Sequence, residues 1–306
     1  MASTQKNRFY VLEIGKPKSP THYLIDTRVS GNGLQIEFDL SKTSDHKHNR
    51  GNGGYVDIYN LTPDIVDALG GDTVYLSLAV GYEDFDPIII LIGESQKCTT
   101  TKEGDDYITR VDIGEGYASL NNTKLKGYTS PGQTVGDVIE QIRKQMPDIS
   151  RGNYTGDILL SPLVCGWRLS GTPREMLRKL CDANRLEYNI NNNVLSVTEV
   201  NGLSNTDTSI CPFITPETGL IHLPYHTTDI PARTAKDKRK RQGVQFRCLL
   251  HPTLAPGSLV RLEAPGWDNA LYRVNTVRHQ GSYRTNEWKS EVQCSLIPDT
   301  EVPQEK

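Results

Sequence analysis

The feature that most constrains the fold of this chain is the alternation of apolar and polar residues between Gly243 and Pro298. It is clearest in GVQFRCLL, which starts at Gly243, and in WKSEVQCSL, which starts at Trp288. Successive side chains of a β-strand point to opposite faces of the sheet, so this period of two predicts an apolar face on a core and a polar face outside. Leu259–Glu263 and Leu271–Val277 have the same period, with Pro-Gly turns beside them. The segment therefore predicts four strands of one small antiparallel barrel or sandwich.

A second strand-rich region lies between residues 8 and 118. Leu34–Leu40 and Val74–Val80 alternate cleanly, and Ile88–Glu94 and Tyr107–Ile113 continue the pattern, which predicts a sheet of about six strands. A short helix is predicted between them, with Thr62 as its N-cap, proline as its first residue and a Gly-Gly pair after its end.

From about residue 120 the apolar period changes to that of a helix. Thr134 precedes one apolar stripe formed by Val135, Val138, Ile139, Ile142 and Met146. Thr172-Pro173-Arg174-Glu175 is a capping-box pattern with proline at the first helical position, and it predicts a second helix. Asn191-Asn192-Asn193 then predicts the turn of a hairpin, because asparagine tolerates the left-handed backbone region.

These patterns predict a mainly β chain with an α+β insert: two small antiparallel β-barrels and a two-helix and hairpin module. We place the first barrel at 1–119, the inserted module at 120–200, and a linker with the second barrel at 201–306. Asn201–Thr218 is the predicted linker.

The composition of the chain limits the cellular compartment and the binding partners that fit it. The formal charge is −3 and the pI is about 6.2, so there is no global attraction to nucleic acid or anionic lipid. Six scattered cysteines without a paired motif favour small buried hydrophobic residues in a reducing compartment. Because no apolar run approaches the length of a membrane span, we expect a soluble chain made in a cytoplasm, without membrane binding.

Three segments together resemble the baseplate hub proteins of contractile-tailed bacteriophages. They are GYVDIYNLTPDIVDAL with the DTVYLSLAVGYED and IIILIGES strands that follow, then SPGQTVGDVIEQI, and finally GLIHLPYH with the strands after Gly243. They occur in the expected order and cover roughly two thirds of the chain.

The resemblance implies a structural virion protein of the tail baseplate that forms a homotrimer. Each chain would supply two tube-type barrels, so that three chains make a pseudo-hexameric ring between the sixfold tail tube and the threefold central spike. It further implies contacts with the tail tube or tube-terminating protein, the spike and the baseplate wedge proteins. DNA would pass only transiently through the lumen during genome ejection.

Catalytic and metal-binding patterns are weak. His46 with His48, and His222 with His226, lack a nearby third ligand at a recognised spacing, so we expect loop and surface histidines, no metal and no cofactor. The acidic groups near Glu83 and Glu103 lie in predicted turns, and nucleophile motifs are missing, so we expect no enzymatic activity.

The strongest charge feature is a basic cluster in DIPARTAKDKRKRQG, before the second barrel. It consists of Arg233, Lys236, Lys238, Arg239, Lys240 and Arg241. Three interpretations stay open: a solvated loop, a contact with an acidic neighbouring tail protein, or a contact with DNA phosphates. No aromatic residues are interleaved, which argues against base stacking.

Two other functions stay open as alternatives to a structural hub. One is a carbohydrate-binding tail module, for which Trp267, Tyr272 and Tyr283 are the only suggestive aromatic residues, and they are dispersed. The other is a tail-associated peptidoglycan hydrolase, which would need a buried carboxyl group with a raised pKa in a cleft.

Overall fold

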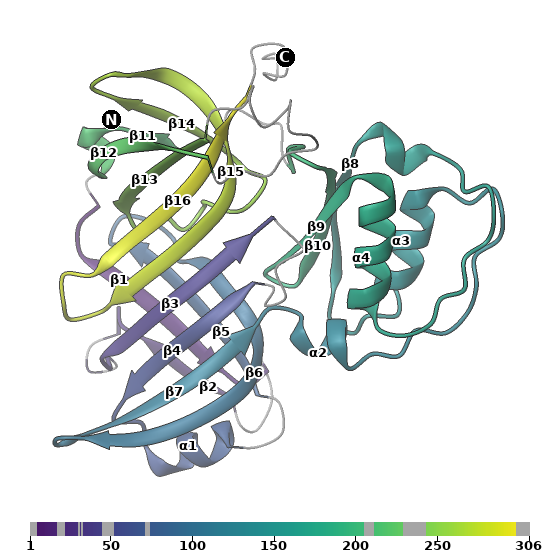
Figure 1. Cartoon of the computed structure of the whole chain (residues 1–306). Helices are drawn as coiled ribbons and strands as arrows, with labels where there is room; N and C mark the ends of the chain where they lie inside the picture. Colours follow the sequence, from purple (N-terminus) through teal and green to yellow (C-terminus); the bar gives the residue numbers. More distant parts are fainter. Residues whose placement is uncertain are drawn as a thin grey trace.

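The computed structural model describes residues 5–16, 22–29, 31, 33–44, 52–70, 74–204, 211–228 and 243–297. Two β-rich halves lie one above the other, and a smaller module of helices and strands stands out from their junction (Figure 1). The predicted fold class, mainly β with an α+β insert, is confirmed. None of the helices in these residues is long and apolar enough to cross a membrane.

Among its described residues the first half contains seven strands and one short helix, where the sequence predicted about six strands. In chain order they are β1 (Arg8–Ile14), β2 (Tyr23–Asp26), β3 (Ile36–Thr43), β4 (Gly53–Tyr59), α1 (Pro63–Leu69), β5 (Tyr75–Tyr82), β6 (Ile88–Glu103) and β7 (Asp106–Gly114). Alternation along β3 is as predicted, since Ile36, Phe38 and Leu40 are buried between half-exposed acidic residues. Helix α1 starts at the predicted proline, although the Thr62 side chain makes no capping hydrogen bond.

The insert packs helices against a three-stranded sheet. Its elements are α2 (Tyr117–Asn121), α3 (Val135–Arg143), β8 (Ser150–Thr155), η1 (Asp157–Leu160), α4 (Pro173–Asn184), β9 (Leu186–Asn191) and β10 (Val194–Glu199). The predicted capping box at Thr172 with Glu175 forms, and Thr134, which precedes the predicted apolar stripe, forms a second one with Asp137. The β9–β10 turn places Asn192 and Asn193 at φ 51° and 59°, the left-handed pair that a two-residue type I′ hairpin requires.

Three elements of the insert were not predicted: the short 3-10 helix η1, strand β8 and helix α2. Strand β8 pairs in parallel with β10, and its sequence SRGNYT has no apolar alternation that would signal a strand. Helix α2 is only five residues long, too short to show a helical period.

The second half contains the four predicted strands and additional elements before them. In order these are β11 (Phe213–Ile214), η3 (Pro216–Thr218), β12 (Leu220–Thr227), β13 (Gly243–Leu249), β14 (Leu259–Ala264), β15 (Trp267–Ser282) and β16 (Trp288–Leu296). Asn201–Thr218 was expected to be only a linker. This was wrong for its last residues, because β11 lies there and pairs in parallel with β14.

The two halves repeat one topology. The strand order β3-β4-β7-β6-β5 of the first half matches β12-β13-β16-β15-β14 of the second, and every pairing in both series is antiparallel. The equivalent long strands of the two series, β6 and β15, also share an irregularity. Strand β6 shifts register at Gln96 against β7, and β15 shifts at Asn275 against β16. This shared bulge fixes which residues of the two halves are equivalent.

The halves are joined edge to edge rather than linked as separate barrels. The second part of β15 pairs with β3 in an antiparallel register from Thr276↔Thr43 to Ser282↔Glu37, which makes one 13-stranded sheet. In the described residues, β12 and β2 form the two ends of its strand order. Leu250 and Trp288 of the second half also pack into the core of the first. The two halves therefore share one continuous sheet and part of one core.

One titratable side chain is locked inside this pair. His279 on β15 is only 1% exposed, and its Nδ1 lies 2.8 Å from Ser290 Oγ. Burial, with the positive charge of Lys42 as a further cause, lowers the pKa of His279 to about 3. The unfolded chain therefore takes up a proton here between about pH 6.5 and pH 3 that the folded protein does not.

We predict that stability falls as pH decreases from 7 to 5 and that His279 carries part of the loss. Urea unfolding of the wild type should lose about 2 kcal/mol more over this interval than urea unfolding of His279→Gln. Between pH 7 and pH 8 the two proteins should behave alike, since the histidine is then neutral in both states. Equal losses from pH 7 to pH 5 would contradict the prediction.

Candidate functional site

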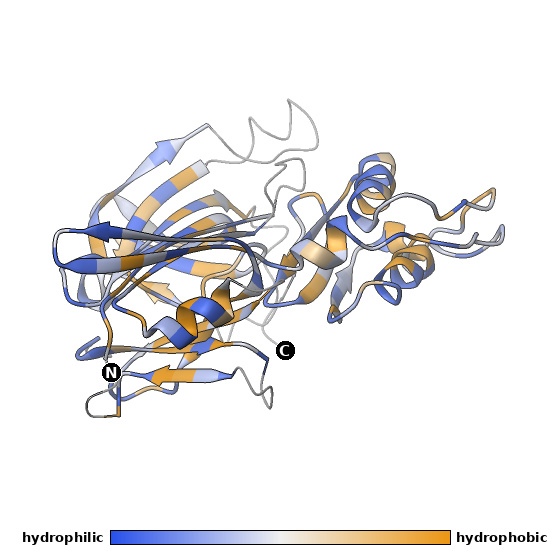
Figure 2. Cartoon of the chain, turned by 90° about the horizontal axis from the view of Figure 1, so that it is seen from below, coloured by the Kyte–Doolittle hydropathy of each residue, from blue (hydrophilic) through white to orange (hydrophobic). Residues whose placement is uncertain are grey.

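The polar face of the joined sheet is the first candidate site. Hydrophilic and hydrophobic residues alternate along the strands in Figure 2, and the apolar positions fill the cores of the two halves. Along β3, β4, β7, β13, β16 and the parts of β6 and β15 after their bulges, the strand registers place twelve charged residues on the opposite face, five basic and seven acidic: Lys97, Arg110, Arg247, Arg278, Lys289, Glu37, Asp39, Asp57, Glu103, Asp106, Asp112 and Glu291. The face is therefore polar, and its formal charge is slightly negative.

Ion pairs between neighbouring strands neutralise this face locally. Arg110 Nε lies 2.7 Å from Asp57 Oδ1, and Arg247 Nη2 lies 3.1 Å from Glu291 Oε1. Arg278 of β15 binds Asp39 of β3 with Nε 2.7 Å from Oδ1, so this pair connects the two halves. Since each cation has a carboxylate beside it, the face has no strong field of one sign that would hold a polyanion.

The second candidate site is the buried junction where the insert meets both halves. Arg273 of β15 is 1% exposed and forms an ion pair with Glu187 of β9 in the insert. Its Nε donates to the Gly202 carbonyl at 2.8 Å, and its Nη1 donates to Asn275 Oδ1 at 2.7 Å. Burial lowers the pKa of Arg273 to about 10, so the guanidinium stays charged at neutral pH.

A second buried ion pair lies on the other side of the same junction. Lys42 Nζ at the end of β3 is 3.0 Å from Glu115 Oε1, and both residues are 3% exposed. Lys42 also donates to the side chains of Asn191 and Asn192 in the insert hairpin, the latter at 3.1 Å. Burial raises the pKa of Glu115, and the positive charge of Lys42 opposes that rise.

Amide hydrogen bonds complete the docking of the hairpin. Asn52 Nδ2 donates to the Ile190 carbonyl at 2.7 Å, and Asn189 Nδ2 donates to the Thr43 carbonyl at 2.5 Å. The insert hairpin is therefore held by charged and amide groups from the ends of β3 and β4, and by Arg273 from β15.

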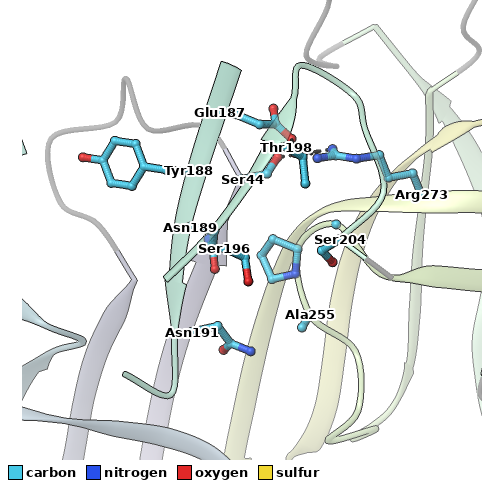
Figure 3. Close-up of a pocket in the computed structure, with 12 residues that line it drawn as sticks. Ser44, Glu187, Tyr188, Asn189, Asn191, Ser196, Thr198, Ser204, Ala255 and Arg273 are labelled. Atoms are coloured by element: carbon cyan, nitrogen blue, oxygen red, sulfur yellow. Dashed lines mark hydrogen bonds and ion pairs between the residues drawn. The ribbon is translucent and has the colours of Figure 1, made fainter. Parts of the chain in front are cut away.

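A small polar cavity of about 90 Å³ lies inside this junction. Figure 3 shows Glu187, Thr198 and Ser44 pointing towards the Arg273 guanidinium, with Ser204 and Ala255 on the other side. Ligand pockets for small molecules are several times larger, at roughly 300–1,000 Å³. The cavity suits a few hydrogen-bonded waters, so the junction is an internal structural site rather than a substrate pocket.

The residues predicted as site candidates do not converge. The basic cluster Arg233, Lys236, Lys238, Arg239, Lys240 and Arg241 lies outside the described residues, as do His46 and His48. His226 packs its ring 4.6 Å from the Trp267 ring, and His222 is in the left-handed backbone region at φ 63°. In the part of the chain that the structure describes, no three His, Cys, Asp or Glu side chains are grouped as metal ligands.

The acidic groups noted in the sequence are exposed in turns. Glu83, Asp84 and Asp86 lie between β5 and β6, while Glu103, Asp105 and Asp106 lie at the β6–β7 turn. The buried charges Lys42, Glu115, Glu187 and Arg273 were missed by sequence reasoning. Each occupies a strand or turn position where a charged residue ordinarily predicts exposure, and no spacing connects them.

No family model matches the sequence, and no curated protein matches it. Solved structures do match in fold. The 43 kDa tail protein of prophage MuSo2 from Shewanella oneidensis has a TM-score of 0.60 at 11% identity, covering 94% of this chain and 98% of that one. A tail protein from Neisseria meningitidis MC58 has a TM-score of 0.59 at 10% identity, covering 96% and 98%.

A third match is the E. coli c3393 protein, described as a type VI secretion component with structural similarity to the T4 bacteriophage tail proteins gp27 and gp5. It has a TM-score of 0.59 at 10% identity, covering 96% of this chain and 79% of that one. The chain therefore has the fold of phage tail proteins, and the resemblance predicted from the sequence is confirmed at the level of fold.

We predict that the Arg273–Glu187 pair is strongly coupled. Arg273→Met or Glu187→Gln alone should lower the free energy of unfolding by about 3–5 kcal/mol, because each leaves a buried group without its partner. The double variant should lose less than the sum of the two single losses.

The matched control is the exposed pair Arg247–Glu291, whose arginine side chain is 49% exposed. Arg247→Met and Glu291→Gln should each cost less than about 1 kcal/mol. Urea denaturation of all six variants measures both cycles. Strictly additive losses at Arg273 and Glu187 would show that the pair does not couple the insert to the second half.

Proposed function

We propose that this protein is a structural component of a bacteriophage tail baseplate, namely the homotrimeric hub that joins the sixfold tail tube to the threefold central spike. The observation that carries the proposal is the repeated topology, β3-β4-β7-β6-β5 and β12-β13-β16-β15-β14, within one chain. The shared fold with phage tail proteins supports the same assignment.

The repeat meets the symmetry requirement of such a hub. Two equivalent halves per chain and three chains make a ring of six similar units, which can face a sixfold tube on one side. The same ring has true threefold symmetry, because the halves differ in sequence and only the connection between them carries the insert. Closed rings of this kind need head-to-tail contacts between unlike surfaces, which the two halves supply.

The polar face of the joined sheet fits the wall of a channel for DNA. Its acidic residues slightly outnumber its basic residues, seven to five, so a passing polyanion meets hydrogen-bonding groups without strong retention. In this proposal DNA contacts the wall only during genome ejection. The spike, the tube or tube-terminating protein and the wedge proteins bind elsewhere on the ring, and the protein resides in the virion of a contractile-tailed phage.

We also propose that the protein catalyses no reaction. The acidic residues in the described turns are exposed to solvent, whereas a glycosidase acid needs a raised pKa in a cleft. Glu115, the buried carboxyl group whose pKa is raised, faces Lys42 within the junction and serves the docking of the insert. Zymography on cell-wall material tests this: no clearing is expected, and clearing would replace the proposal with a hydrolase.

We predict a trimer in solution. Size-exclusion chromatography with light scattering should give three times the chain mass of 34.1 kDa, at high protein concentration or with the spike protein present. A strictly monomeric protein at every concentration and with every tail partner would contradict the hub assignment. A glycan array in parallel should show no binding, since binding would favour a carbohydrate-recognition module.

A further inference from the structure

The outer side of the insert carries the most exposed apolar side chains among the described residues. Two connections, 122–134 and 160–171, run side by side beyond α3 and α4 as seen from the sheets (Figure 1 and Figure 2), and we call them the outer ribbon. Val164 is 98% exposed, Tyr128 80% and Leu160 76%, whereas no other large hydrophobic residue described exceeds 62%. Single exposed apolar residues are ordinary, but three on one ribbon indicate an interaction site.

The outer ribbon is held in a fixed conformation. Leu125 and Leu169 are buried in the core of the insert and anchor one segment each. Backbone hydrogen bonds join the two segments, from Leu125 N to the Gly171 carbonyl at 3.0 Å, from Thr129 N to the Trp167 carbonyl at 2.7 Å, and from Gly132 N to the Leu163 carbonyl at 2.9 Å. Because the ribbon is already ordered, a partner can bind it with little loss of conformational entropy.

The charge of the outer ribbon narrows the kind of partner. Lys124, Lys126 and Arg168 are exposed, and neither segment contains aspartate or glutamate. The chain as a whole has a formal charge of −3, so the ribbon is opposite in sign to the molecule that carries it. A partner with complementary chemistry combines carboxylates with exposed apolar side chains.

The same chain presents this combination between β5 and β6. The segment EDFDPII, residues 83–89, contains three exposed acidic residues and no basic one, and we call it the acidic turn. Phe85 is 50% exposed, and Ile88 and Ile89 are each 38% exposed. The outer ribbon and the acidic turn both lie within the continuously described stretch 74–204, so the match rests on described residues alone.

The acidic turn is anchored where the two halves meet, and it keeps its charge. Tyr82 Oη, directly before the turn, donates to the Leu250 carbonyl at 2.9 Å. Arg28 lies near Asp86, but its Nη2 is 2.7 Å from Asp26 Oδ2, so its charge is already matched. The carboxylates of the turn are therefore available to a cationic surface.

The second acidic turn fits the outer ribbon less well. The segment KEGDDY, residues 102–107, also contains three carboxylates, but it has no aliphatic residue. It carries its own cation, since Lys102 Nζ lies 5.5 Å from the centre of the Tyr107 ring. The β6–β7 turn is therefore a matched control for charge without the apolar component.

We propose that the outer ribbon of one copy binds the acidic turn of a second copy. The exposed apolar side chains of the two surfaces pack together, and the three cations of the ribbon face the three carboxylates of the turn. Because the two surfaces differ, the contact is head to tail, and successive copies close into a ring or continue as an open chain. The number of copies rests on the proposed hub function, whereas the contact rests on the match between the surfaces.

Site-specific photo-cross-linking of the full chain tests the contact. The variant Val164→p-benzoylphenylalanine places a photoreactive ketone at the most exposed position of the ribbon. After irradiation, a denaturing gel should show a covalent dimer at twice the chain mass of 34.1 kDa, with the cross-link mapped by mass spectrometry to residues 83–89. The same probe at the exposed Asp105 should give no cross-link to these residues.

Charge reversal identifies the partner surface. In the Val164 probe chain, reversal of the ribbon should lower the dimer yield about tenfold, and so should reversal of the acidic turn. A chain with both reversals should recover to within about twofold, because the two surfaces are again opposite in sign. The ribbon set is Lys124→Glu, Lys126→Glu and Arg168→Glu, the turn set is Glu83→Lys, Asp84→Lys and Asp86→Lys, and the control set is Glu103→Lys, Asp105→Lys and Asp106→Lys. The control set should leave the yield unchanged.

Light scattering on the same samples separates this inference from the proposed function. A trimer with cross-links to the acidic turn supports both. Cross-linked copies that remain dimers or extend without closing support the contact and contradict the trimeric hub. A trimer whose cross-links miss residues 83–89, or whose double reversal does not restore them, overturns the contact and leaves the hub standing. A monomer without cross-links overturns both.

Flotation with vesicles that contain anionic phospholipid tests the other chemistry that a basic and apolar ribbon fits. No flotation of the wild type is expected. Flotation that is lost in the ribbon-reversed chain, together with an absence of cross-links to the acidic turn, would assign the ribbon to a membrane surface and overturn the contact between copies.

Discussion

The antiparallel pairing of β3 with β15 is the interaction on which the rest of the structure depends. It turns two sheets of equivalent topology into one, and it puts Leu250 and Trp288 of the second half into the core of the first. The Arg278–Asp39 ion pair adds a fixed register to the joint within the chain.

The insert is held at this joint by buried charges rather than by an apolar interface. Arg273 with Glu187 and Lys42 with Glu115 are almost fully buried, and each pair is supported by further hydrogen bonds. Buried ion pairs add little net stability compared with apolar contacts, but a misplaced partner is costly because an unpaired charge stays behind. The junction therefore fixes where the insert points relative to the sheet, which matters for a protein whose role in our proposal is to position its neighbours.

The local elements of this fold were largely predictable, because their signals are local. The capping boxes at Thr134 and Thr172 and the Asn192-Asn193 turn depend on residues within a few positions of each other. The strand β8, in contrast, depends on parallel pairing with β10, and the linker strand β11 depends on β14. Neither partner can be identified from a short-range sequence pattern.

The candidate site was likewise predictable only where its signal is local. Alternation predicted a polar face on the sheet, but the ion pair of Arg273 with Glu187 and the hydrogen bonds of Lys42 to the insert hairpin join residues far apart in the chain, and no periodicity records them.

The account depends on two quasi-equivalent halves that encircle a pore, and a three-dimensional reconstruction of the assembled particle by electron cryomicroscopy tests it most directly. We predict a ring of three chains in which the two halves of each chain superpose strand for strand and the polar face of the sheet lines the channel. A map in which the halves take up unrelated positions, or in which the copies do not surround a channel, would contradict the account.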